Sequence, residues 1–140
     1  MIILDTNVVS EPLRPTPDDG VVEWLDAQAA ETLYITTISL AEIRFGIASL
    51  PKGRRKQRLH DRFEGEFLPP FADRILVFDE PASSAYAAIR ARARVEGNSV
   101  GDFDALIASI ARVHGFLVAT RDTTPFEAVG VPVVNPFRPG

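Results

Sequence analysis

Four acidic side chains, each placed where a predicted strand gives way to a helix or a turn, could together bind a hard divalent cation. They are spread over nearly the whole chain: Asp5, Glu42, Asp104 and Asp122. Two carboxylates about 5 Å apart repel by about 3 kcal/mol at an effective dielectric constant near 20. A cluster of four must therefore take up protons or hold a cation, provided that the fold brings the side chains together.

The available ligand atoms favour Mg²⁺ or Mn²⁺ over zinc. A site made only of oxygen atoms suits Mg²⁺ or Mn²⁺, whereas zinc prefers thiolates and imidazoles. The chain has no cysteine, and its only histidines are His60 and His114. One or two divalent ions held between carboxylates can activate a water and relieve charge on a phosphodiester, so no side-chain nucleophile is needed.

Three of these acids also have an ordinary structural interpretation. Asp5 follows an apolar run and is placed to cap a helix. Ser39 and Glu42 have the spacing of a capping box, in which the acid folds back onto a backbone amide, and local sequence favours that interpretation. Asp122 is typical of a turn. Only convergence of the carboxylates decides between the two roles.

The fourth acid has a close neighbour that competes with it for the same role. Asp102 and Asp104 are two positions apart, so on a helix their side chains point about 200° away from each other. We therefore expect one to act as a ligand and the other as a helix cap. The small residues Ala105 and Ala108 leave room for a buried carboxylate, and this favours Asp104 as the ligand.

Short apolar runs alternate with helical patterns along the chain. The runs predict strands at residues 2–4, 33–36, 75–78, 116–119 and 131–134. Periodicity and capping signals predict helices near 8–13, from 18 or 19, at 39–51, near 59–67, at 79–97 and at 101–115. Residues 120–125 are expected to form a turn, and the Pro-rich tail need not be ordered throughout. This alternation predicts a mainly parallel sheet covered on both faces, with ligands bound beyond the carboxyl ends of the strands.

Length and composition are those of an ordinary globular domain. The chain has 140 residues, of which 46% are hydrophobic and 24% charged, so we expect one domain over 1–140. No segment is long and apolar enough to span a bilayer. The N-terminal residues read as a strand rather than a signal peptide, and the lack of cysteine is compatible with a reducing compartment, so we expect a cytoplasmic protein.

The charge distribution contains one local basic stretch within an acidic total. A net charge of −4 and a pI near 5.1 do not favour strong nonspecific binding to nucleic acid. Five basic residues nevertheless fall close together: Lys52, Arg54, Arg55, Lys56 and Arg58. A solvated helix face is the favoured interpretation of this stretch, and binding of a phosphate or a partner is the alternative.

Four short motifs, taken in order, resemble those of a known family. They are Asp5-Thr6-Asn7 after the first strand, the helix start from Ser39 to Glu42, the stretch 101–108, and the strand and turn at 117–122. Together they are similar to the PIN domain, specifically to the VapC/FitB-like toxins. The resemblance covers nearly the full length and implies a three-layer α/β/α fold with a mainly parallel central sheet.

The resemblance also implies an activity and partners. It implies a ribonuclease whose Asp5, Glu42, Asp104 and Asp122 form an acidic pocket for Mg²⁺ or Mn²⁺. It further implies the toxin of a type II toxin-antitoxin pair, homodimeric and silenced by a small antitoxin that also binds operator DNA. We expect Asp5, Glu42 and Asp104 to hold the metal and Asp122 to assist, while Thr6 and Thr120 hydrogen-bond to the pocket.

Three other functional classes share parts of this pattern. A phosphatase with a DxD signature would need an acid where Asn7 stands. A receiver-type phosphoacceptor domain would need paired acids there and a late lysine, but the only lysines are Lys52 and Lys56. A noncatalytic PIN-fold module that binds an antitoxin or nucleic acid stays open, although the presence of all four acids argues for the enzyme.

Overall fold

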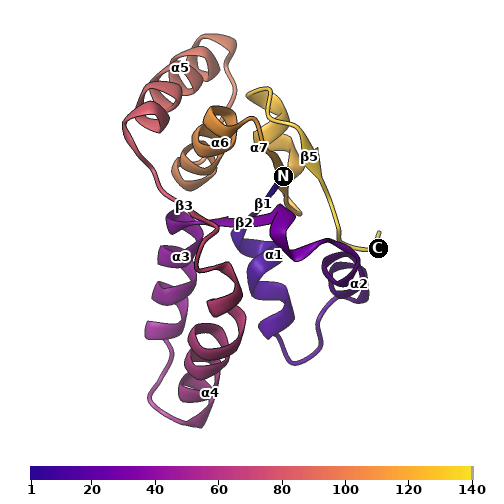
Figure 1. Cartoon of the computed structure of the whole chain (residues 1–140). Coiled ribbons are helices and arrows are strands. Elements are labelled where there is room, and N and C mark those ends of the chain that lie inside the picture. Colours follow the sequence, from indigo (N-terminus) through magenta and orange to yellow (C-terminus); the bar gives the residue numbers. More distant parts are fainter. Residues whose placement is uncertain (140) are drawn as a thin grey trace.

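A parallel five-stranded sheet forms the centre of the computed structural model, which describes residues 1–139 (Figure 1). The strand order is β3-β2-β1-β4-β5, and every neighbouring pair is parallel. The strands are β1 (Ile2–Leu4), β2 (Leu33–Thr36), β3 (Ile75–Leu76), β4 (Leu117–Ala119) and β5 (Val133–Val134). The predicted α/β fold with a mainly parallel sheet is therefore confirmed.

Helices supply most of the remaining structure and all of the connections between strands. The α-helices are α1 (Thr6–Ser10), α2 (Asp19–Ala27), α3 (Thr37–Ala48), α4 (Arg54–Arg62), α5 (Glu80–Glu96), α6 (Asp102–His114) and α7 (Thr123–Ala128). Short 3₁₀ turns are η1 (Glu11–Leu13), η2 (Ala30–Thr32) and η4 (Pro69–Phe71), and η3 (Phe63–Phe67) is a π-helical turn that continues α4. Two glycines in the left-handed conformation, Gly97 and Gly115, end α5 and α6.

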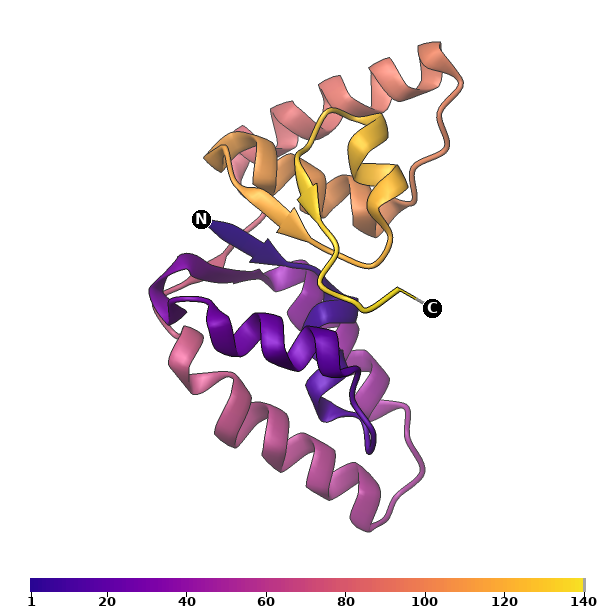
Figure 2. The same ribbon diagram turned by 90° about the vertical axis from the view of Figure 1, so that its right-hand side faces the viewer.

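The sheet is covered by helices on both faces, which gives three layers (Figure 2). Helices α1 to α4 lie on one side, and α5, α6 and α7 lie on the other. Ile3 packs into the core on the α5–α6 side and Leu4 into the core on the α1–α4 side. Because successive side chains of a strand point to opposite faces, a strand buried on both sides must be apolar throughout. This explains why the strands read as short apolar runs.

Aromatic packing attaches α4 to the rest of its layer. Phe63 is fully buried and stacks on Phe67, which in turn stacks on Phe71. Arg44 of α3 donates two hydrogen bonds to the carboxylate of Glu64, at 2.8 and 3.1 Å. These contacts hold α4 beside α3. A groove separates this pair of helices from α1 and η1.

One segment that was predicted to be a turn forms a helix instead. Residues 120–125 were expected to form a turn, but the chain enters α7 at Thr123. Pro125 lies in the first turn of this helix, where its missing N–H removes no intrahelical bond. Phe126 is fully buried on the α6 side of the sheet and stabilises the helix through tertiary packing.

The chain continues past β5 into a C-terminal segment that packs against the core. The C-terminal segment is packed at least as far as Phe137, which is buried in the core with α1 and α2. Gly140 lies outside the described residues, so the single domain over 1–140 stays a prediction. Among residues 1–139, no helix has the length and hydropathy needed to cross a membrane.

Candidate active site

The four acids predicted to converge come from both helical layers at one end of the sheet. Asp5 follows β1, Glu42 lies in the helix after β2, Asp104 lies in the first turn of α6, and Asp122 lies between β4 and α7. The carboxyl ends of parallel strands share one edge, which is where ligands bind in such sheets. Electrostatic repulsion links Asp104 to each of the other three acids, so the side chains occupy one region.

Asp5 is the most deeply placed of these carboxylates. Its side chain is hydrogen-bonded on both oxygens: the Thr6 amide donates to Oδ1 at 2.8 Å, and the Thr120 hydroxyl donates to Oδ2 at 2.8 Å. The residue is only 4% exposed to solvent. Asp5 therefore caps α1, as its ordinary interpretation predicts, and also presents a buried carboxylate to the acidic region.

Burial changes the acidity of Asp5. The pKa of this carboxyl is raised from 3.8 to about 6, mainly because burial disfavours the ionised form and to a smaller extent because of the nearby charges of Asp104 and Glu42. The hydrogen bonds from Thr120 and Thr6 oppose this rise, because they favour the ionised form. A cation beside Asp5 would remove the cost of ionising it, which is the behaviour expected of a metal ligand.

The capping-box interpretation of Glu42 is wrong. The cap of α3 is Thr36, whose hydroxyl accepts a hydrogen bond from the Ser39 amide at 3.2 Å. Glu42 instead accepts a hydrogen bond of 2.7 Å from the Thr6 hydroxyl, which also lies 3.0 Å from the Ser39 hydroxyl. Glu42 is thus held in the acidic region by a residue from the first turn after β1.

Asp104, rather than Asp102, belongs to the acidic region. Burial raises the pKa of the Asp104 carboxyl, and the charges of Asp122 and Glu42 raise it further. Asp102 points the other way, with an 80% exposed side chain that pairs with Arg90 of α5 at 3.1 Å. The expected cap by Asp102 is absent from the described residues, because Gly101 takes the cap position of α6 with no side-chain bond.

Asp122 occupies the mouth of the region. It is exposed, and its carboxylate makes no capping bond to α7. Its backbone amide donates a 3.0 Å hydrogen bond to the Thr120 hydroxyl, the same hydroxyl that donates to Asp5. Thr120 therefore ties the position of Asp122 to that of Asp5, and the hydrogen-bonding role predicted for Thr6 and Thr120 is confirmed.

Sequence reasoning missed the part that Asn7 plays in this arrangement. Its side-chain amide donates to the Thr120 hydroxyl at 3.3 Å and to Asp5 Oδ2 at 3.5 Å, while its oxygen accepts from the Arg121 amide at 3.1 Å. Asn7 therefore connects the ends of β1 and β4. The available signal was its place in Asp5-Thr6-Asn7, directly after a buried strand.

The carboxylate oxygens suit a partly hydrated Mg²⁺ or Mn²⁺ ion, and they do not form a closed cage of protein ligands. Within the described part of the chain, no three acidic or imidazole side chains are close enough to hold one ion by themselves. Mg²⁺ keeps several of its waters and is commonly held by one or two carboxylates, so a closed protein cage is not required. Asp5, Glu42, Asp104 and Asp122 could supply one or two such carboxylates.

The raised pKa values predict how the free energy of unfolding depends on pH in the absence of metal. Because folded Asp5 binds its proton more tightly than the unfolded chain does, its contribution to the free energy of unfolding is present below pH 3.8 and is lost as pH rises to about 6. A rise from 3.8 to about 6 corresponds to about 3 kcal/mol. The raised pKa of Asp104 acts in the same direction.

In EDTA, Asp5→Asn should therefore be progressively more stable than wild type from pH 4 to pH 6, as measured by denaturant unfolding. A difference that is constant with pH would contradict the assignment.

The sequence matches a known protein family over most of its length. Residues 2–132 match the profile of the PIN domain. The chain is a member of the PIN-domain family. Two relatives cover this PIN domain almost completely. It is 50% identical over 139 residues to the VapC ribonuclease Y4jK of Sinorhizobium fredii, and 50% identical over 138 residues to the toxin FitB of Neisseria gonorrhoeae, with 99% of each chain covered in both cases.

Solved structures agree with this assignment. The PIN domain superposes on a chain of the FitAcB crystal structure from Neisseria gonorrhoeae with a TM-score of 0.94, at 50% identity and covering 97% of this chain and 98% of that chain. It also superposes on a structure of FitAB bound to an IR36 DNA fragment, with a TM-score of 0.95, at 48% identity and covering 100% of this chain and 98% of that one. The predicted resemblance to VapC/FitB-like PIN domains is confirmed.

Proposed function

We propose that this PIN domain is an endoribonuclease that depends on Mg²⁺ or Mn²⁺, and that it is the toxin of a type II toxin-antitoxin pair. The observation that carries the proposal is the gathering of four carboxylates around the buried Asp5, whose pKa is raised to about 6. Such a site is costly without a cation. The names of the relatives, a VapC ribonuclease and the toxin FitB, support the same activity and role.

The bound ion would supply an activated water and neutralise charge on the phosphodiester. The protein groups have distinct parts in this scheme. Asp5, fixed by Thr6 and Thr120, and Glu42, fixed by Thr6, present ligand oxygens in defined orientations. Asp104 completes the set from α6. Asp122, at the exposed mouth, would accept a hydrogen bond from the attacking water and so position it.

The partners follow from the same relatives. A structure of FitAB bound to an IR36 DNA fragment supports a partner chain for this PIN domain. In this proposal the partner is a small antitoxin, and operator DNA is contacted only through it. A homodimer of the PIN domain and a cytoplasmic location stay predictions. Purified protein without its antitoxin is accordingly the form in which activity should be measured.

The proposed activity has a direct test. Partner-free protein is incubated with RNA in Mn²⁺, in Mg²⁺ and in EDTA, and its melting temperature is measured in the same buffers. We expect cleavage only with a divalent ion. We also expect the ion to raise stability by about 2.7 kcal/mol at 100 times its dissociation constant, because it binds the folded state alone.

Two results would count against the proposal in different ways. Cleavage that persists in EDTA would exclude the metal-dependent mechanism. Absence of cleavage in every buffer, with binding to the antitoxin retained, would favour the noncatalytic PIN-fold module instead.

A further inference from the structure

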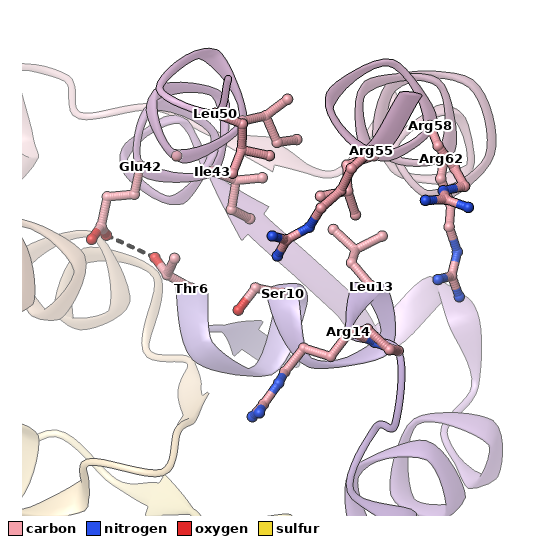
Figure 3. Close-up of a pocket in the computed structure, with 14 residues that line it drawn as sticks. Thr6, Ser10, Leu13, Arg14, Glu42, Ile43, Leu50, Arg55, Arg58 and Arg62 are labelled. Atoms are coloured by element: carbon pink, nitrogen blue, oxygen red, sulfur yellow. Dashed lines mark hydrogen bonds between the residues drawn. The ribbon is translucent and has the colours of Figure 1, made fainter. Parts of the chain in front are cut away.

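A groove opens directly from the acidic region. Its volume is about 810 Å³, and it runs between the first helices of the chain and the α3–α4 pair (Figure 3). Thr6 and Glu42 line one end of it, so the groove and the candidate active site are continuous. Five aliphatic side chains are among the residues that line it: Leu13, Ile43, Ile47, Leu50 and Leu59.

Three arginines of α4 line this groove and form what we call the guanidinium row. They are Arg55, Arg58 and Arg62, spaced by three and four residues, so they share one face of the helix. Figure 3 shows Arg55 on the side nearer Thr6 and Glu42, with Arg58 and Arg62 farther from them. The row spans about 10 Å along the helix axis and leads away from the acidic region.

No ion pair to the guanidinium row is found within residues 1–139. Among the residues that the structure describes, none of the three arginines forms a salt bridge or a side-chain hydrogen bond, although Arg14 in the same groove pairs with Glu11 at 3.2 Å. Like charges at this spacing on a helix destabilise it slightly. Three neighbouring unpaired cations in a chain of net charge −4 therefore mark a place for an external anion.

The basic stretch noted in the sequence divides between two faces. Arg55 and Arg58 face the groove beside the acidic region, whereas Lys52 and Lys56 line a different hollow on the far side of α3 and α4. Lys56 is hydrogen-bonded there: its ammonium group donates to the Ala48 carbonyl at 2.9 Å. The solvated-face interpretation thus fits only part of the stretch.

We propose that the guanidinium row binds successive backbone phosphates of a single-stranded RNA segment and leads that strand to the acidic region. The inference rests on the proposed ribonuclease function and names how its substrate is held. Guanidinium groups bind phosphate oxygens through paired hydrogen bonds, and their charge is insensitive to pH. The row is continuous with the carboxylates that would act on the next phosphodiester.

The shape of the site selects a single strand. Asp5 is buried, so the reacting phosphodiester must enter a recess, which a flexible strand can do and a rigid A-form duplex cannot. Among residues 1–139, no aromatic side chain lines the groove, so this part of the chain offers no stacking platform for bases. The guanidinium row would therefore contact the RNA backbone and add affinity that depends little on base sequence.

The test compares two triple variants of equal charge. The row variant is Arg55→Gln/Arg58→Gln/Arg62→Gln. The control variant removes the same charge from exposed positions outside the groove, as Lys52→Gln/Arg94→Gln/Arg112→Gln. Binding of a fluorescent single-stranded RNA of about 12 nucleotides is measured in EDTA, so that no cleavage occurs, and over about 50 to 200 mM salt.

We expect the row variant to bind about tenfold more weakly than the control variant. Each lost phosphate contact reduces the slope of log affinity against log salt by about 0.7 for a single strand, so the row variant should show a slope shallower by about 2. With Mn²⁺, its cleavage should show a raised KM and a nearly unchanged kcat, because the row does not touch the reacting phosphate. A duplex of the same sequence should bind the two variants equally.

Three outcomes would overturn the inference. Equal affinity and equal salt slopes for the two variants would remove the row from RNA binding while leaving the ribonuclease proposal intact. If the row variant binds and cleaves RNA normally but no longer associates with co-expressed antitoxin, the row belongs to a protein interface. If wild-type protein neither binds nor cleaves RNA, the proposed function itself has failed.

Discussion

Asp5→Asn is expected to reduce RNA cleavage by roughly two to three orders of magnitude, since several kcal/mol of transition-state stabilisation would depend on the ion that this carboxylate is proposed to hold. The change is nearly isosteric, and Oδ1 can still accept the hydrogen bond from the Thr6 amide. The fold should therefore survive. The rate is measured with Mn²⁺ and excess RNA.

A second readout separates loss of the ion from loss of the fold. Addition of Mg²⁺ or Mn²⁺ should raise the melting temperature of wild type and leave that of Asp5→Asn nearly unchanged. In EDTA at neutral pH the variant should be at least as stable as wild type, because it removes a buried charge that is repelled by Asp104 and Glu42. Asp26→Asn, on the exposed side of α2, is the matched control and should behave as wild type. An Asp5→Asn protein with full activity would show that Asp5 only caps α1.

The second large effect is a contrast between two neighbouring acids. Asp104→Asn should also lower cleavage by about two orders of magnitude or more, because Asp104 is electrostatically linked to the other three carboxylates. Asp102→Asn should retain activity within a few-fold. Its only loss is an exposed ion pair with Arg90, and such a pair contributes about 1 kcal/mol or less.

The pair of variants is informative because both remove one negative charge from the first turn of α6. Any general effect of charge on helix stability or RNA binding should appear in both. Cleavage rates with Mn²⁺ and melting temperatures of the two proteins provide the measurement. If Asp102→Asn were the inactive protein, the register of α6 relative to the acidic region would be wrong.

Local signals predicted the positions of the five strands and several helix starts, although β3 and β5 are each two residues shorter than the predicted 75–78 and 131–134. Residues 33–36 form β2 as predicted, and Asp79 accepts the capping bond from the Ala82 amide that its position before Pro81 suggested. These features depend on neighbouring residues: an apolar run buried on both faces, or an acid placed to accept an orphan amide. Such rules act over a few residues and can be applied without knowing the fold.

Predictions from neighbouring residues failed where a contact with a distant part of the chain was stronger than the local preference. Ser39 and Glu42 have the spacing of a capping box, yet Thr36 caps the helix and Thr6 binds Glu42. The turn predicted at 120–125 became α7 because Phe126 is buried against the core. In both cases a contact across more than thirty residues or a buried side chain outweighed a preference of the local sequence.

The sequence by itself determined the kinds of atoms available for chemistry: four carboxylates near the ends of apolar runs, no thiols, and a short arginine-rich helix. Only the tertiary structure decided which of these groups share a space. It brought Asp5, Glu42, Asp104 and Asp122 together, turned Asp102 toward Arg90, and set an unpaired arginine face beside the acids. The reason is physical: residue type fixes what a side chain can bind, whereas burial and mutual repulsion depend on distances that only the folded chain defines.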